Sequence, residues 1–102
     1  MPVKSHPVKL NNFVVPVFNF LKKLPKGRVT TYGALAKRFH VPAPRNIGWI
    51  LKQNAEPDRI PCYKVIRADG RLAGGYKFGG LKEQRRRLLA DGVKFKNNRV
   101  VF

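Results

Sequence analysis

The proline-containing segment HVPAP, residues 40–44, is the feature that most restricts the fold, because it separates two short stretches of helical spacing. The first stretch, TYGALAKRF, can be capped by Thr30 or Thr31. In the second, PRNIGWILKQN, the prolines favour a rigid helix start. Two short helices joined by a tight turn, the second of them polar and basic, predict a helix-turn-helix, and an ordinary helical hairpin is the alternative. The expected buried positions are Tyr32, Leu35, Ala36, Phe39, Ile47, Ile50 and Leu51.

The charge of the chain favours the helix-turn-helix over the hairpin. There are 22 Lys and Arg against 5 Asp and Glu, a formal net charge of +17. Adaptation to heat explains this poorly, because heat-adapted surfaces usually balance Lys with Glu. So large an imbalance repels itself unless a polyanion is bound, and we therefore expect a nucleic-acid partner. The candidate DNA contacts are Thr31, Arg45, Asn46, Lys52 and Lys64.

The other segments predict a mostly α, winged-helix-like domain with a small β element. An N-terminal helical pattern contains Pro16, which fits only in a first turn, so this helix is expected to begin at Val14 or Val15. IPCYKVI, residues 60–66, has the β-branched alternation of a strand. LKEQRRRLLAD predicts a last helix, and VKFKNNRVVF a closing hairpin. The last helix is expected to turn Leu81, Leu88 and Leu89 inward and to stop at Gly92.

We expect residues 1–10 to be a flexible basic arm and residues 11–102 to be a single domain, with no separate N-terminal domain. No apolar run is long enough to span a membrane, and the N-terminal segment has no apolar core of a secretion signal. A cytoplasmic protein is expected, associated with the nucleoid if the source is a prokaryote.

The single cysteine, Cys62, excludes an internal disulfide, and with His6 and His40 it gives no zinc-ligand pattern. The glycine-rich LAGGYKFGG lacks the features of a phosphate-binding loop. Cys62 is therefore either a small buried hydrophobe in a strand or a nucleophile at the mouth of a pocket.

Several motifs occur together in one order: GRVTTYGALA, PRNIG, Asn54 upstream of Ile60-Pro61-Cys62, GGYKFGG and a Leu-rich helix. This order resembles the C-terminal active-site domain of the O6-alkylguanine-DNA alkyltransferase family, over about residues 13–92. The resemblance implies direct repair of double-stranded DNA that contains O6-alkylguanine. The nucleotide is flipped out, its alkyl group passes irreversibly to a cysteine, and the monomeric protein acts once without a metal or cofactor.

The resemblance also implies roles for individual residues. Arg45 matches an arginine that fills the gap left by the flipped nucleotide, from a helix that enters the minor groove. Tyr32 matches a tyrosine that helps rotate the nucleotide. Cys62 matches the alkyl acceptor, and Asn54 the residue that holds the turn before it. Val65 matches the residue whose carbonyl helps read the guanine. Tyr76 and Lys77 match the lid segment of the family, in which a backbone N–H approaches O6 of the base.

The chain departs from the family pattern beside the cysteine. The family motif Pro-Cys-His-Arg is replaced by Pro61-Cys62-Tyr63-Lys64, and the carboxylate that orients the histidine corresponds to Asp91. The predicted relay is thus Cys62–Tyr63–Asp91, although tyrosine, with a pKa of about 10, is a weaker base than histidine. Nearby cations, Lys64 and Arg67, are expected to favour the thiolate.

Two other functions stay open. An alkyltransferase-like protein would bind and flip the lesion without accepting the alkyl group, but members of that class replace the cysteine, which this chain keeps. A general basic helix-turn-helix protein would bind DNA with no preference for alkylated sites.

Overall fold

The computed structural model describes residues 9–102, so most of the arm expected at residues 1–10 lies outside the described residues. The elements are, in chain order, α1 (Asn11–Lys22), β1 (Thr30–Thr31), α2 (Tyr32–Arg38), α3 (Pro44–Leu51), the 3-10 turn η1 (Cys62–Lys64), β2 (Val65–Ile66), α4 (Gly80–Ala90), β3 (Phe95–Lys96) and β4 (Arg99–Val100). β1 pairs with β2 in parallel, and β3 pairs with β4 antiparallel. The expected class, mostly α with a small β element, is confirmed.

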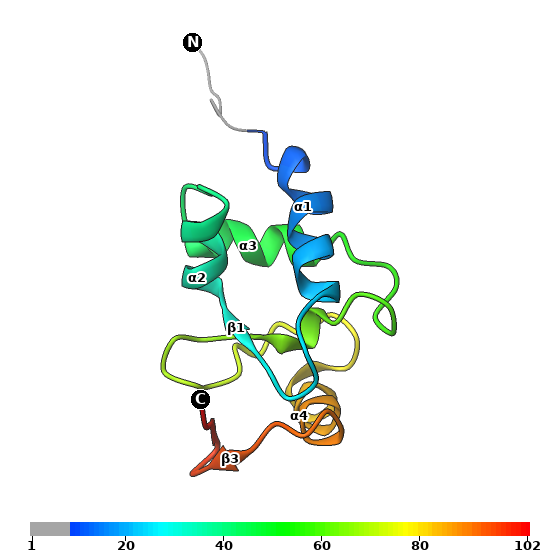
Figure 1. The fold of residues 1–102 in the computed structure, drawn as a ribbon, viewed down its shortest axis with the longest axis vertical. Helices are drawn as coiled ribbons and strands as arrows, with labels where there is room; N and C mark the ends of the chain where they lie inside the picture. The colour runs from blue at the N-terminus through cyan, green and yellow to red at the C-terminus, as the bar shows by residue number, and fades with distance from the viewer. Residues whose placement is uncertain (1–8) are drawn as a thin grey trace.

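Two groups of elements meet at the β1–β2 pair (Figure 1). α1, α2 and α3 gather at one end of the molecule, and α4 and the C-terminal hairpin lie at the other. The main core is formed by buried residues of the first three helices together with Ile60, Cys62 and Val65. A smaller core joins Ile66 to Leu88 of α4 and to the hairpin. The Cys62 segment therefore lies where the two halves join.

α2 and α3 pack against each other across a tight turn, as the helix-turn-helix prediction requires. The Thr31 hydroxyl accepts a hydrogen bond from the Ala34 N–H at 3.0 Å and so caps α2. In α3, Pro44 occupies the first turn, where no backbone N–H is needed. His40 takes a left-handed conformation in the turn between the helices, with a φ of 57°.

α1 begins earlier than the sequence predicts, at Asn11 rather than Val14 or Val15. Pro16 therefore lies inside the helix, where it cannot donate a hydrogen bond to the Asn12 carbonyl. Asn12 and Pro16 are both exposed, so water can satisfy that carbonyl. The cost of the proline is reduced on this face, and the helix continues through it.

The strand predicted for IPCYKVI is mostly wrong, because only Val65–Ile66 is extended. Cys62–Lys64 forms a 3-10 turn instead, in which the Lys64 N–H donates to the Pro61 carbonyl at 3.0 Å. Before it, the Cys62 N–H donates to the Ile60 carbonyl at 2.8 Å. These bends are held by tertiary contacts with Asn54 and with the loop after α1. The alternation of apolar residues in the sequence carries no information about such contacts.

The inward face of α4 is also different from the prediction. Leu88 is fully buried, but Leu81 and Leu89 are about half exposed, at 51% and 50%. Gln84 is buried in their place. Gln84 and Leu88 are four residues apart and share one face, which lies against the Cys62 segment.

The C-terminal predictions are confirmed. Gly92 has a φ of 91° and follows the end of α4. Asn97 and Asn98 both have a positive φ, at 53° and 62°, as a two-residue hairpin turn requires. In the described part of the chain, no helix is long and apolar enough to cross a bilayer.

Candidate active site

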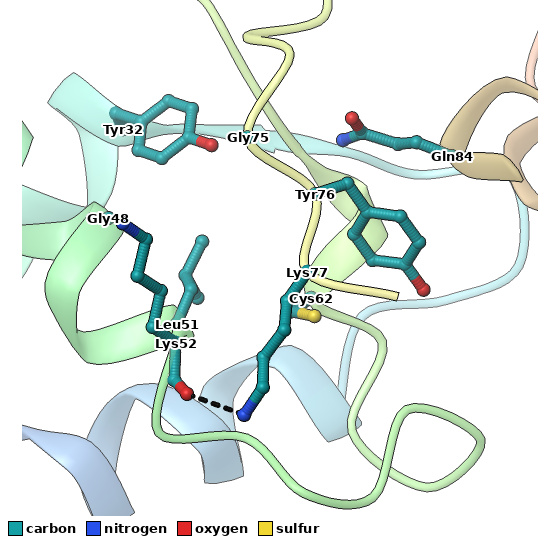
Figure 2. Close-up of a pocket in the computed structure, with 9 residues that line it drawn as sticks. All are labelled: Tyr32, Gly48, Leu51, Lys52, Cys62, Gly75, Tyr76, Lys77 and Gln84. Atoms are coloured by element: carbon teal, nitrogen blue, oxygen red, sulfur yellow. Dashed lines mark hydrogen bonds between the residues drawn. The ribbon is translucent and has the colours of Figure 1, made fainter. Parts of the chain in front are cut away.

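Cys62 lies at a pocket of about 480 Å³, a volume that includes its open mouth (Figure 2). Tyr32 at the start of α2, together with Gly48 and Leu51 of α3, lines the pocket from the helix-turn-helix. The segment before α4 contributes Gly75, Tyr76 and Lys77 to the same pocket. The remaining lining residues are Lys52 and Gln84.

Asn54 fixes the position of the cysteine. Its side chain is fully buried, and its Nδ2 donates to the Cys62 Sγ at 3.3 Å and to the Ile60 carbonyl at 2.9 Å. Its Oδ1 accepts from the Glu56 N–H at 2.8 Å. One amide therefore joins the end of the α3 segment, the following loop and the thiol, which fits the turn-holding role predicted for it.

The pKa of the Cys62 thiol is raised, because burial disfavours the thiolate. The hydrogen bond from Asn54 and the positive charges of Arg87 and Lys77 act in the opposite direction. The cations that favour the thiolate are thus not the Lys64 and Arg67 named from the sequence. Arg87 and Lys77 are both distant from Cys62 in the sequence, and Arg87 belongs to α4.

The ammonium of Lys64 is buried, with only 4% of its side chain exposed. It forms an ion pair with Asp91 Oδ2 at 3.0 Å and donates to the Pro25 carbonyl at 3.0 Å. The same Asp91 oxygen accepts from the Gly27 N–H at 2.8 Å. The prediction that Lys64 contacts DNA is therefore wrong, because its charge is enclosed by protein.

The Cys62–Tyr63–Asp91 relay is not formed as a chain of hydrogen bonds. Asp91 and Tyr63 line one side cavity, yet within residues 9–102 no hydrogen bond joins the Tyr63 hydroxyl to Asp91 or to Cys62. The Asp91 carboxylate is instead engaged by Lys64. Burial, and then the charge of Asp91, raise the pKa of Tyr63. Any part of Tyr63 in proton transfer stays a prediction.

The predicted lid segment is held by Lys77. Its Nζ donates to the Lys52 carbonyl at 2.9 Å (Figure 2) and to the Asn54 carbonyl at 3.0 Å, so it binds the end of the α3 segment. The Tyr76 ring packs edge-on against Phe78. The Tyr76 hydroxyl is buried without a hydrogen-bond partner among the described residues, and burial raises its pKa to about 12.

The predicted DNA contacts of the helix-turn-helix lie around α3 and the start of α2. Arg45 and Lys52 are exposed, at the beginning of α3 and just after its end. Asn46 and Thr31 use their side-chain oxygens to hold backbone N–H groups at helix starts. Their contact with DNA stays a prediction.

Gln84 was missed by the sequence analysis. It is 3% exposed, and its Nε2 donates to the carbonyls of Tyr63 and Val65, at 3.0 and 3.3 Å. Val65 itself is fully buried and does not line the pocket, and its carbonyl, predicted to read the base, already accepts this hydrogen bond. The available signal was a polar residue four positions before a core leucine.

No group of three or more His, Cys, Asp or Glu side chains able to hold a metal ion is found within residues 9–102.

Comparison with known proteins gives one consistent result. Residues 12–93 match the model of the 6-O-methylguanine DNA methyltransferase DNA-binding domain. A bifunctional methyltransferase/endonuclease of Picrophilus torridus is 45% identical over 85 residues, which are 82% of this chain and 28% of that protein. A DNA base-flipping protein of Vibrio parahaemolyticus is 31% identical over 83% of this chain and 84% of its own length. The chain thus spans little more than a quarter of the first relative.

Two solved structures are similar to most of the chain. The first is S. pombe Atl1 in complex with damaged DNA containing O6-carboxymethylguanine. Its TM-score is 0.74 at 26% identity, over 87% of this chain and 83% of that chain. The second is the O6-methylguanine-DNA methyltransferase of Pyrococcus kodakaraensis. Its TM-score is 0.68 at 36% identity, over 79% of this chain and 46% of that chain.

Proposed function

The chain belongs to the 6-O-methylguanine DNA methyltransferase family, and from this premise we propose that it repairs alkylated double-stranded DNA directly, by moving the alkyl group of O6-alkylguanine onto Cys62 in a single turnover. The observation that carries the proposal is the placement of Cys62. A lone thiol, held by a buried asparagine, lies at a pocket whose other walls come from the helix-turn-helix and the glycine-rich segment.

The pocket suits a base that has left the DNA stack. A base inside a duplex is out of reach of a side-chain nucleophile, so it has to be extruded at a cost of about a few kcal/mol. Tyr32 and the α3 residues Gly48 and Leu51 connect the pocket to the helix that carries Arg45. An extended, planar cation at Arg45 suits both the gap in the stack and the neighbouring phosphates.

In the proposed reaction, the Cys62 thiolate attacks the alkyl carbon attached to O6. A carbon–sulfur bond forms, the carbon–oxygen bond breaks, and its electron pair stays on guanine, which takes up a proton. In this proposal, a backbone N–H of the Tyr76–Lys77 segment donates a hydrogen bond to this leaving group as charge develops. The thioether is inert, so each molecule acts once.

Thiolate formation in this proposal depends on fixed groups around the sulfur. The Asn54 amide donates to Sγ, and Lys77 and Arg87 add positive charge. These groups offset part of the effect of burial, which raises the pKa of Cys62, and they favour the thiolate without a general base. We propose that residues 11–102 form a single DNA-binding and alkyl-accepting domain and act as a monomer.

A second candidate is binding and flipping of the lesion without transfer. It is supported by the similarity to a DNA base-flipping protein and to Atl1. The raised pKa of Cys62, and the lack of a hydrogen-bonded base beside its thiol among residues 9–102, support it as well. Retention of the cysteine favours transfer. A general basic DNA-binding protein would leave the thiol and its pocket without a use.

The test is the intact mass of the protein after incubation with a duplex that contains one O6-methylguanine. We expect the mass to rise by one methyl group in the native protein and to stay unchanged in Cys62→Ser, which keeps the size of the side chain. An unchanged mass together with tighter binding to the lesion than to plain duplex would identify the non-catalytic sensor. An unchanged mass with no preference would leave a general DNA-binding protein.

A further inference from the structure

We propose that Trp49 is an apolar anchor for the DNA duplex, which packs against sugars and base edges beside the flipped nucleotide and adds affinity that does not depend on salt. The proposal rests on the function proposed above. It gives a role to a side chain that belongs to none of the site residues predicted from the sequence and does not line the Cys62 pocket. The partner of Trp49 is the duplex next to the lesion, and the lesion itself is bound elsewhere.

Trp49 is the one exposed aromatic residue of the described helices. It is 40% exposed, whereas the Phe and Tyr residues of α1 and α2 are buried or half-buried. It belongs to neither hydrophobic core. Within residues 9–102, its indole N–H donates no hydrogen bond, and no aromatic ring or cation stacks on its ring. Since Trp is highly buried on average, an indole left in this state points to a partner outside the chain.

The side chain lies on the face of α3 that is turned away from the core. The inner face of this helix is formed by its three buried residues, Ile47, Ile50 and Leu51. Because an α-helix turns once in about 3.6 residues, Trp49, two positions after Ile47, points to the opposite side. Arg45 lies one turn before it and Lys52 one turn after it, and both are exposed. The indole is therefore an apolar group between two cations on one surface.

This surface lies beside the mouth of the pocket. Gly48, which directly precedes Trp49, lines the pocket from α3 (Figure 2). In the proposed function the flipped base enters the pocket while the rest of the duplex stays outside it. The outer face of α3 then meets the nucleotides on either side of the lesion, and Trp49 lies in the middle of that face.

Tryptophan suits such a contact chemically. Its ring offers a large, rigid apolar area, and proteins that enter the minor groove often place apolar side chains against its base edges. The indole N–H can donate to N3 of purines or O2 of pyrimidines, which are acceptors at that edge in every base pair. Such a contact distinguishes sequences poorly. It therefore suits a protein that has to find a lesion in any sequence.

The first measurement uses the indole itself. The chain has a single tryptophan, so selectively excited fluorescence reports on Trp49 alone. Acrylamide quenching is measured for Cys62→Ser protein, free and saturated with a duplex that contains O6-methylguanine, and anisotropy of a labelled duplex shows that binding is complete. We expect the free indole to be readily quenched and the bound indole to be shielded several-fold. Equal quenching in the free and bound states would overturn the proposal.

The second measurement compares Trp49→Ala with Leu89→Ala over a salt series, both in the Cys62→Ser protein. Leu89 is also apolar and exposed, at 50%, and it belongs to α4 at the other end of the molecule (Figure 1). We expect Trp49→Ala to raise Kd by about 10-fold at every salt concentration, in the range found for one aromatic anchor. The slope of log Kd against log salt should not change, because an uncharged side chain releases no counterions. Leu89→Ala should leave both Kd and slope unchanged.

Equal Kd values for folded Trp49→Ala and Leu89→Ala would overturn the proposal. A smaller slope in Trp49→Ala would overturn it as well, since the residue would then act through the phosphate contacts of its neighbours. Should circular dichroism show that Trp49→Ala does not fold, the quenching of the native indole decides. Failure of the proposed function has a different signature, namely equal Kd values of the Cys62→Ser protein for the lesion and plain duplexes while the indole is still shielded by both.

Discussion

The thiol of Cys62 is subject to opposing effects that single side chains can separate. Burial raises its pKa, while the Asn54 hydrogen bond and the charges of Arg87 and Lys77 lower it. Lys77 is the most accessible of the three to mutation, because its residue is exposed while its Nζ is fixed between two carbonyls. At this scale, the reactivity of the nucleophile is set by residues of three different segments.

Replacement of Lys77 by Met should raise the pKa of Cys62 further. At any pH below that pKa a smaller fraction of thiol is then ionised, so the profile of reaction with iodoacetamide moves to higher pH. We expect the rate near pH 8 to fall by about threefold, the effect of about half a pKa unit. The rate is measured by intact mass over a pH series. Lys96→Met, on the exposed β3 strand, should leave the profile unchanged, and an unchanged profile in Lys77→Met would refute the assignment.

Replacement of Tyr63 by Phe tests the relay predicted from the sequence. The Tyr63 hydroxyl has no hydrogen bond to Cys62 or Asp91 within residues 9–102, and burial and Asp91 raise its pKa, which makes it a poorer proton donor and a still rarer phenolate. We therefore expect Tyr63→Phe to retain methyl transfer within about twofold in single-turnover kinetics. A loss of tenfold or more would restore Tyr63 as a participant in proton transfer.

Among the elements, those with a strong local pattern were predictable from the sequence. The Thr31 cap, the inward face of α3 and the Asn97–Asn98 turn each depend on a few neighbouring residues. The 3-10 turn at Cys62 was not predictable, because it is held by Asn54 and by partners of Lys64 that are distant in the sequence.

The residues of the candidate site also divide into those that were predictable from the sequence and those that were not. The motif order located Cys62 and Tyr32, which line one pocket, and Asn54, which donates a hydrogen bond to the Cys62 thiol. The charge of Lys64 was misread as a surface charge, because its partner Asp91 is 27 positions away in the sequence and its burial depends on the packed fold. Gln84 carries no motif, and only the contact between α4 and the Cys62 segment reveals it.

The Lys64–Asp91 pair connects three elements, namely the loop after α1, the turn after Cys62 and the end of α4. Asp91→Asn tests this connection, because asparagine can still accept from the Gly27 N–H but leaves the buried Lys64 ammonium without a counter-charge. We expect the free energy of unfolding in urea to fall by about 3 kcal/mol.

The matched control is Asp69→Asn, whose carboxylate faces solvent and pairs only loosely with Arg71, at 3.8 Å. Its asparagine oxygen can keep the bond to the Arg71 N–H, so little change in stability is expected. Equal effects of the two substitutions would mean that the Lys64–Asp91 pair adds no more stability than a surface pair does.

For the molecule as a whole, the net charge of +17 and the pocket make separate contributions to DNA binding. Phosphate contacts release counterions, so they give an affinity that falls steeply with salt and is the same for every sequence. In the proposed function, the pocket meets the flipped base mainly with groups that carry no fixed charge, such as Tyr32 and Cys62. Of its two lysines, Lys77 is already bound to protein carbonyls, and Lys52 is exposed to solvent. Affinity and lesion preference should therefore respond differently to ionic strength.

The corresponding prediction concerns the Cys62→Ser protein bound to duplexes with and without O6-methylguanine. Plots of log Kd against log salt concentration should be parallel for the two duplexes, so that absolute affinity falls while the lesion preference stays constant. Arg45→Gln should lower both slopes by about one, as expected for the loss of one phosphate contact. A preference that disappears at high salt would place its origin in charged contacts, either with the phosphates of a distorted backbone or from Lys52 at the pocket, because hydrogen bonds from uncharged groups to the base release no counterions.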